Sequence, residues 1–284
     1  MKQPRTISIA KESESNHGPL RLQAHWSNQN THRAVLFLHG YKGYADWGCW
    51  GLMCERLSEM GFHAFRLDFS GNGTTWERPN EIHDLEAWAD NTYRQELHDA
   101  IAAVQTLRHR GLEVILMGHS RGGGIATIAA GALRNTNYSV KGLILLASVS
   151  DFESRFPKGS ALARWESTDR WEVKNGRTGE VYHHKFRFYL DFQRFHQLLN
   201  IEGQAARVEA PVLIVHAEDD QAVPIQASKR LAAILKQKNA VQELYLKAGG
   251  HTLGSKEPWP YNKPLPKEMA DLLPEIGHFI RSLA

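Results

Sequence analysis

A serine between two glycines is the first feature of this chain that could carry out a chemical reaction. The pentapeptide Gly118-His119-Ser120-Arg121-Gly122 follows the apolar run 114–117 and precedes a segment rich in small residues. A sharp turn between a strand and a helix exposes the serine hydroxyl, and glycines two positions away remove the Cβ atoms that would collide there. The position of the pattern, more than the pattern alone, predicts a nucleophilic Ser120.

A serine hydroxyl is a weak nucleophile until a histidine takes its proton and an acid orients that histidine. Three acidic residues follow the apolar, β-branched run 211–216, namely Glu218, Asp219 and Asp220. Side chains at the carboxyl ends of parallel strands share one edge of the sheet, where ligands bind. Each of the three carboxylates is therefore a candidate for the acid.

The base is expected after the last strand, which the alternation of residues 241–246 predicts. Gly249 and Gly250 follow this strand, and His251 comes next. Of the 15 histidines in the chain, His251 is the one in a glycine loop at this place. Because glycines allow the backbone to turn sharply, the loop can bring the imidazole to Ser120.

These stretches together resemble the α/β-hydrolases of the serine aminopeptidase-like and carboxylesterase-like group. The similarity extends from about residue 20 to the C-terminus, and it is weakest between about residues 151 and 205. The matching stretches are 39–48, 66–73, the serine turn, the acidic loop and 250–253.

The resemblance implies roles for particular residues. The spacing Asp-x-x-Val-Pro at 220–224 resembles the acid loop of many α/β-hydrolases, so Asp220 is preferred as the acid and Asp219 is the alternative. The backbone N–H groups of Tyr41 and Arg121 are the expected oxyanion-hole donors. Such a site forms an acyl-enzyme on Ser120 and requires neither a metal nor an organic cofactor.

The elements that must hold these residues alternate along the chain as in an α/β protein. We expect the α/β-hydrolase fold: a mostly parallel eight-stranded sheet with an N-terminal antiparallel hairpin that turns at 16–19, and helices on both faces. The strands are expected near 6–10, 20–26, 34–38, 62–67, 113–117, 142–147, 211–216 and 241–246. The helices are expected near 48–60, 90–110, 122–134, 225–238 and 266–282.

A long interval separates two of the expected strands. We expect residues 1–150 and 206–284 to form the core domain and residues 151–205 to form a lid or cap insertion, with a small hairpin over 171–184 and helical turns. The insertion is rich in aromatic residues, among them Trp165 and Trp171. These two tryptophans are candidates for substrate contact, although such residues also pack on their own domain.

Composition excludes several other classes of protein. The chain has 284 residues and a formal net charge of +3, with acids and bases interspersed, so neither nucleic acid nor membrane insertion is expected. The first residues lack the apolar core of a secretory signal, and a cytoplasmic protein is expected. Two cysteines, Cys49 and Cys54, are too few for a disulfide framework.

The expected substrate is a small-molecule carboxylic ester with a small to medium acyl chain. An aminopeptidase or amidase and a thioesterase use the same three residues and stay open as alternatives, as does a binding protein without catalysis. Lys42 and the Arg121 side chain flank the expected oxyanion site, which would favour an anionic end on the substrate, unless both cations are paired within the protein. The oligomeric state is open, with a homodimer as one option.

Overall fold

The computed structural model describes residues 5–9, 20–176, 178–260 and 262–283. Ten strands lie in these residues: β1 (Arg5–Ile9), β2 (Leu20–His25), β3 (Arg33–Leu38), β4 (His63–Asp68), β5 (Glu113–His119), β6 (Gly142–Leu146), β7 (Trp171–Lys174), β8 (Val181–His184), β9 (Val212–Ala217) and β10 (Val241–Leu246). The α-helices are α1 (Trp50–Glu59), α2 (Leu85–Asp90), α3 (Tyr93–His109), α4 (Arg121–Leu133), α5 (Ser160–Thr168), α6 (Arg187–Arg194), α7 (Ile201–Ala205), α8 (Gln226–Leu235) and α9 (Lys267–Ser282).

Eight of the strands form one sheet in the order β1-β2-β4-β3-β5-β6-β9-β10. Strand β2 runs antiparallel to β1 and β4, and the pairs from β4 to β10 are parallel. This confirms the predicted mostly parallel sheet with an antiparallel pair at its N-terminal end. The expected turn at 16–19 lies outside the described residues.

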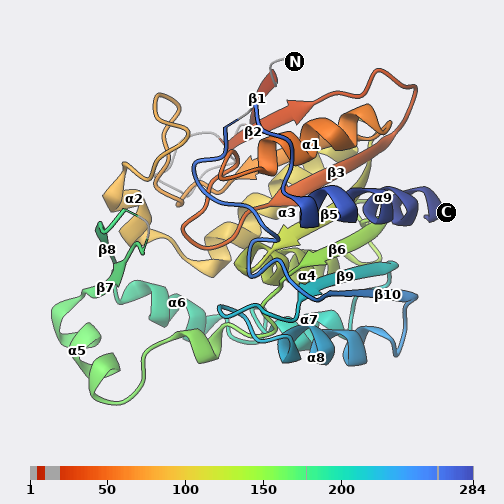
Figure 1. Cartoon of the computed structure of the whole chain (residues 1–284). Helices are drawn as coiled ribbons and strands as arrows, with labels where there is room; N and C mark the ends of the chain where they lie inside the picture. Colours follow the sequence, from red (N-terminus) through yellow and green to blue (C-terminus); the bar gives the residue numbers. More distant parts are fainter. Residues whose placement is uncertain (1–4, 10–19, 177, 261, 284) are drawn as a thin grey trace.

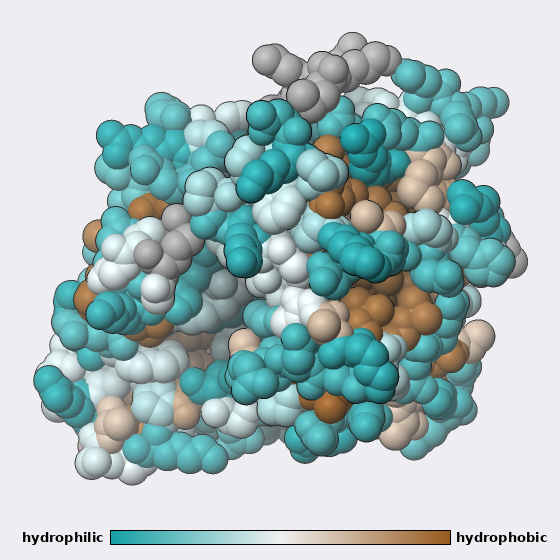
Figure 2. All heavy atoms as spheres, viewed as in Figure 1, coloured by the Kyte–Doolittle hydropathy of each residue, from teal (hydrophilic) through white to brown (hydrophobic). Residues whose placement is uncertain are grey.

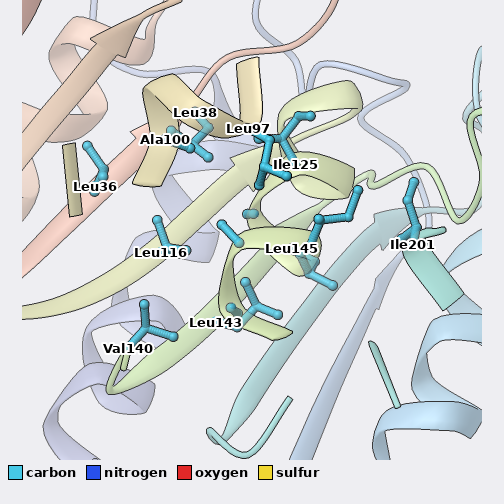
Figure 3. Packing of buried hydrophobic residues seen from close by; sticks show 14 of the residues in the cluster. Leu36, Leu38, Leu97, Ala100, Leu116, Ile125, Val140, Leu143, Leu145 and Ile201 are labelled. Atoms are coloured by element: carbon cyan, nitrogen blue, oxygen red, sulfur yellow. The ribbon is translucent and has the colours of Figure 1, made fainter. Parts of the chain in front are cut away.

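The two faces of the sheet have separate hydrophobic cores, because successive side chains of a strand point to opposite faces. Leu36 and Leu116 belong to the core with α3, α4 and α8, whereas Phe37 and Met117 belong to the core with α1 and α9. Figure 3 shows Leu97 and Ala100 of α3 and Ile125 of α4 close to the strand residues of the first core. Helices on both faces are therefore confirmed (Figure 1).

One predicted helix has a different start in the structure. The helix expected over 90–110 is α3, which begins at Tyr93, whereas the short helix α2, which ends at Asp90, was not expected. Thr92 has an extended backbone with φ −136° and ψ 158°, and its side chain accepts a hydrogen bond from the N–H of Gln95. A threonine N-cap of this kind stabilises the start of a new helix, which a count of apolar residues did not predict.

The segment between β6 and β9 contains α5, the hairpin β7–β8, α6 and α7. The hairpin is antiparallel, with Trp171 opposite His184. Phe156, Trp165 and Phe188 of this segment join the same hydrophobic cluster as α3 and α4. The segment is thus packed onto the sheet domain through a shared core, and Figure 1 shows β7, β8 and α2 at one side of the molecule.

The surface in the view of Figure 1 is mostly hydrophilic, with a hydrophobic area around β9 and β10 below α9 (Figure 2). Strand β10 is the last strand of the sheet, and all six of its residues are half-buried. Leu244 and Leu246 pack against the core shared by α1 and α9. No helix of the described residues is long and apolar enough to cross a membrane.

Candidate active site

Ser120 has a strained backbone between β5 and α4. Its φ is 55° and its ψ is −117°, a conformation that costs a non-glycine residue about 1–3 kcal/mol. The two flanking positions require glycine, because a side chain at either one would collide with the backbone. A Cβ atom on Gly118 would lie 2.3 Å from the carbonyl oxygen of Gly122, and one on Gly122 would lie 2.3 Å from the carbonyl oxygen of Leu38. The predicted sharp turn is therefore present, with the serine at its apex.

The structure brings together three side chains from loops that are far apart in the sequence. Oγ of Ser120 lies 2.9 Å from Nε2 of His251, and Nδ1 of His251 lies 2.8 Å from Oδ2 of Asp220. Both are ordinary hydrogen-bond distances. In this arrangement the Nδ1–H of His251 donates to the carboxylate, so that Nε2 is the acceptor for the serine proton.

Asp220 is held in place by four hydrogen-bond donors. Oδ1 accepts hydrogen bonds from the backbone N–H groups of Ala222 at 2.8 Å and Val223 at 3.0 Å. Oδ2 faces both His251 and Nε2 of His216, the latter at 3.1 Å. Burial acts to raise the pKa of this carboxyl, but the hydrogen bonds from His216, His251 and Val223 hold the pKa well below its ordinary value. Asp220 is therefore charged.

The two neighbouring acids have other partners. Asp219 is exposed, and its Oδ1 accepts a hydrogen bond from the backbone N–H of Gly250 at 2.8 Å. Glu218 is also exposed and pairs with Lys247 at 2.9 Å. The geometry thus selects Asp220 from the three candidates, while Asp219 fixes the backbone beside His251.

The two expected oxyanion donors belong to segments that border Ser120. After β3 the chain turns sharply, with a hydrogen bond of 3.1 Å from the N–H of Gly43 to the carbonyl oxygen of Gly40. A Cβ atom on Gly40 would lie 3.1 Å from Cβ of Ser120, so the turn that carries Tyr41 lies directly against the serine. Arg121 is the first residue of α4, and its N–H therefore has no intrahelical acceptor.

Both cations expected beside the oxyanion site have partners within the protein. Nη1 of Arg121 donates to Oε1 of Glu96 at 2.9 Å, and both side chains are buried. The guanidinium also lies 4.0 Å from the ring centre of Tyr41. Nζ of Lys42 donates to the carbonyl oxygen of Lys174 at 3.1 Å. Each cation is therefore paired within the protein, and neither requires a bound anion as its partner.

The two tryptophans proposed for substrate contact lie in the inserted segment. Trp165 is only 1% exposed, and its Nε1–H donates to the carbonyl oxygen of His184 at 2.8 Å. Trp171 is half-buried, with its ring centre 4.9 Å from that of Trp165. In this structure Trp165 lies within the core of the segment and has no surface for a ligand, because its ring is enclosed by other aromatic residues.

Three buried histidines near the site were missed by the sequence reasoning. His216 contacts Asp220, Nε2 of His119 lies 2.8 Å from the carbonyl oxygen of His251, and Nε2 of His184 lies 2.9 Å from the hydroxyl of Tyr41. His216 and His119 could have been recognised in the sequence, since each is a polar residue at the end of an apolar strand. His184 could not, because only the folding of the insertion brings it to Tyr41.

Comparison with known proteins assigns the family. Residues 29–255 match the family described as serine aminopeptidase, S33. The chain belongs to this family. Solved structures that resemble it are α/β-hydrolases, among them α/β-hydrolase domain-containing protein 10 from mouse, with a TM-score of 0.70 and 19% identity over 100% of both chains. The predicted α/β-hydrolase fold is therefore confirmed.

Two curated relatives of this S33 member are named as lipases. A lysophosphatidylserine lipase of Danio rerio is 26% identical over 255 residues, which are 87% of this chain and 59% of that protein. A monoacylglycerol lipase of Mycolicibacterium smegmatis is 24% identical over 240 residues, which are 78% of this chain and 81% of that protein. The chain thus spans less than two thirds of the first relative. The relatives support a hydrolase.

Metal ligands do not gather at this site. Within the described ranges, no group of three or more histidine, cysteine, aspartate or glutamate side chains has the arrangement of a metal site. Cys49 and Cys54 are buried free thiols, and burial raises the pKa of each to about 11. The arrangement of Ser120, His251 and Asp220 is that of a nucleophile with its base and an orienting acid.

Proposed function

We propose that this protein is a serine hydrolase that cleaves carboxylic esters with a small to medium acyl chain. The observation that carries the proposal is the hydrogen-bonded series from Asp220 through His251 to Ser120, with distances of 2.8 and 2.9 Å. The strained conformation of Ser120 supports the same conclusion, since strain of this kind is retained where it serves a function.

The reaction follows from the positions of the proton donors and acceptors. Nε2 of His251 takes the proton from Oγ of Ser120 as this oxygen attacks the carbonyl carbon of the ester, and the charge of Asp220 stabilises the resulting imidazolium. The backbone N–H groups of Tyr41 and Arg121 receive the developing oxyanion. His251 then donates its proton to the leaving alcohol. In the second half of the reaction, His251 takes a proton from water as the water attacks the acyl group, and it returns this proton to Oγ of Ser120 as the carboxylic acid leaves.

The inserted segment 151–205 acts as a cap over this reaction. Two hydrogen bonds connect its hairpin to the turn beside Ser120, one from Lys42 to the backbone of Lys174 and one between Tyr41 and His184. A cap next to the nucleophile excludes water and limits the size of the acyl group. We infer that the inserted segment sets the size of the substrate that the site accepts.

The first experiment measures hydrolysis of p-nitrophenyl acetate, butyrate and octanoate near pH 8. The wild-type protein is expected to hydrolyse part of this series, and Ser120→Ala is expected to lose at least about 1,000-fold in kcat. Ser167→Ala is the matched control, because Ser167 is exposed and its hydroxyl donates to the backbone carbonyl of Arg164 on the same helix. Labelling by a fluorophosphonate probe should disappear in Ser120→Ala alone. Activity or labelling that survives in this variant would reject Ser120 as the nucleophile.

A second candidate is an aminopeptidase, which the description of the family favours. Aminoacyl anilides test it, because their hydrolysis requires a site for a free amino group. Monoacylglycerols and a lysophospholipid belong in the same panel, since two relatives are named as lipases. Hydrolysis of anilides faster than esters, lost in Ser120→Ala, would replace the esterase proposal with the peptidase.

A further inference from the structure

His216 lies behind the proposed triad and makes contacts that no step of the reaction uses. It is the fifth residue of β9 and is fully buried. Its Nε2 lies 2.8 Å from the carbonyl oxygen of Val223 and 3.1 Å from Oδ2 of Asp220. Its Nδ1 lies 2.7 Å from Oγ of Ser228 on α8.

These contacts determine which nitrogen of His216 carries a proton. A carbonyl oxygen and a charged carboxylate can only accept hydrogen bonds, so Nε2 carries the ring proton, which is bonded to the carbonyl oxygen of Val223 and lies beside Oδ2 of Asp220. In the neutral ring, Nδ1 then accepts the hydroxyl proton of Ser228. The two rings at Asp220 therefore share one oxygen, since Oδ2 also accepts the Nδ1–H of His251 at 2.8 Å.

We propose that His216 is a positioning residue that orients Oδ2 of Asp220 and moderates the negative charge that Asp220 presents to His251. The proposal rests on the proposed function, because it requires that Asp220 and His251 serve Ser120. A donor on the far side of Oδ2 withdraws charge from the carboxylate. Without this donor, Asp220 would stabilise the imidazolium of His251 more strongly in the resting enzyme.

Few other titratable groups face this series. His119 on β5 packs against His251, with 4.8 Å between ring centres, and burial lowers the pKa of His119 to about 3. His119 is therefore neutral throughout the range in which an esterase is assayed. Asp219 bonds the backbone of Gly250 and is exposed. Ser228 does not titrate in this range.

Three substitutions at position 216 separate positioning from simple packing. The amide nitrogen of glutamine can occupy the place of Nε2 of histidine, whereas asparagine is shorter and reaches only toward Ser228. His216→Gln is expected to retain kcat/KM within about threefold, and His216→Asn and His216→Met are expected to lose about tenfold or more. KM should change less than kcat, since the substrate does not touch this residue.

The pH profile of kcat/KM provides the deciding readout. In His216→Asn and His216→Met the acid limb should move up by about half a unit to one unit, because His251 holds its proton more tightly beside a less neutralised Asp220. In His216→Gln the limb should stay in place. Equal losses in all three variants with an unmoved acid limb would mean that His216 only fills space, and a downward movement would reverse the proposed charge effect.

Folding and nucleophile identity are measured on the same samples. Circular dichroism and thermal unfolding identify a variant that does not fold, and the polar pair His216→Gln and His216→Asn decides the question if His216→Met is lost. Ser120→Ala is included in each assay. If its activity equals that of the wild type, the proposed function fails, whereas a result confined to position 216 concerns only the positioning role.

Discussion

The hydroxyl of Tyr41 lies 2.9 Å from Nε2 of His184, and this contact joins the turn after β3 to the hairpin of the inserted segment. The two rings are also stacked, with centres 5.8 Å apart, and Trp88 stacks on both. Burial lowers the pKa of His184 well below its ordinary value, so its ring is neutral. The residue proposed to provide an oxyanion N–H is thus held by its side chain to the segment proposed as a cap.

Removal of this hydroxyl should weaken turnover more than binding. Tyr41→Phe keeps the stacked ring and loses one hydrogen bond, for which we expect a loss of about 1 kcal/mol, or about fivefold in kcat. The matched control is Tyr138→Phe, because Tyr138 has the same 2.9 Å contact with a histidine, His109, on the exposed surface. Steady-state kinetics on a p-nitrophenyl ester checks both. Equal kcat values for the two variants would contradict a role of the contact in the site.

The choice of the acid can be tested with adjacent residues. Asp220→Asn is expected to reduce kcat by about 1,000-fold or more, since His251 would lose the charge that orients it. Asp219→Asn, one position away and exposed, should change kcat only a few-fold. The pKa of Asp220 lies well below its ordinary value, so the wild type should show no acid limb from this carboxylate above pH 4. A larger loss in Asp219→Asn would transfer the role to that residue.

The pair of Arg121 and Glu96 should contribute to folding far more than a surface pair. Their side chains are 10% and 4% exposed, and truncation of one partner leaves a buried charge at a cost of about 3–5 kcal/mol. We expect Glu96→Ala to lower the free energy of unfolding by this amount in urea denaturation. Glu59→Ala removes a 2.6 Å pair with Arg56 on the surface and should cost at most about 1 kcal/mol. Similar losses of unfolding free energy in the two variants would contradict the larger contribution expected of the buried pair.

The serine turn should not tolerate a methyl group at Gly122. A Cβ atom there would lie 2.3 Å from the carbonyl oxygen of Leu38, and strand β3 cannot move without disturbing the sheet. Gly122→Ala is therefore expected to lose about 3 kcal/mol or more of stability, together with its activity. Gly176→Ala is the control, because among the described residues no atom beyond its chain neighbours lies within 4 Å of the added Cβ. Equal thermal unfolding temperatures for the two variants would disprove the steric argument.

Much of the fold could be predicted from the local pattern of residues. All the expected strands of the main sheet are present, because buried parallel strands are short apolar runs between turn residues. The start of α3 at Tyr93 was missed, since it depends on the side-chain cap at Thr92 and not on hydrophobic pattern. The hairpin over 171–184 was expected from its turn residues and is present as β7 and β8.

The sequence by itself determined the candidates for the site. Ser120 and His251 stand in glycine turns next to strands, and such turns depend on backbone conformations that a local pattern predicts. The residues alone left Glu218, Asp219 and Asp220 as candidates for the acid, and the resemblance to α/β-hydrolases favoured Asp220. These inferences need only the order of residues along one segment.

Only the tertiary structure decided which groups meet across segments. Asp220 was selected over Asp219 because one carboxylate points to His251 and the other to the backbone of Gly250. His216 beside Asp220, and His184 beside Tyr41, likewise depend on how strands, loops and the insertion pack. The physical reason is that a hydrogen bond requires atoms within about 3 Å of each other, and residues distant in sequence reach that separation only when the whole core is packed.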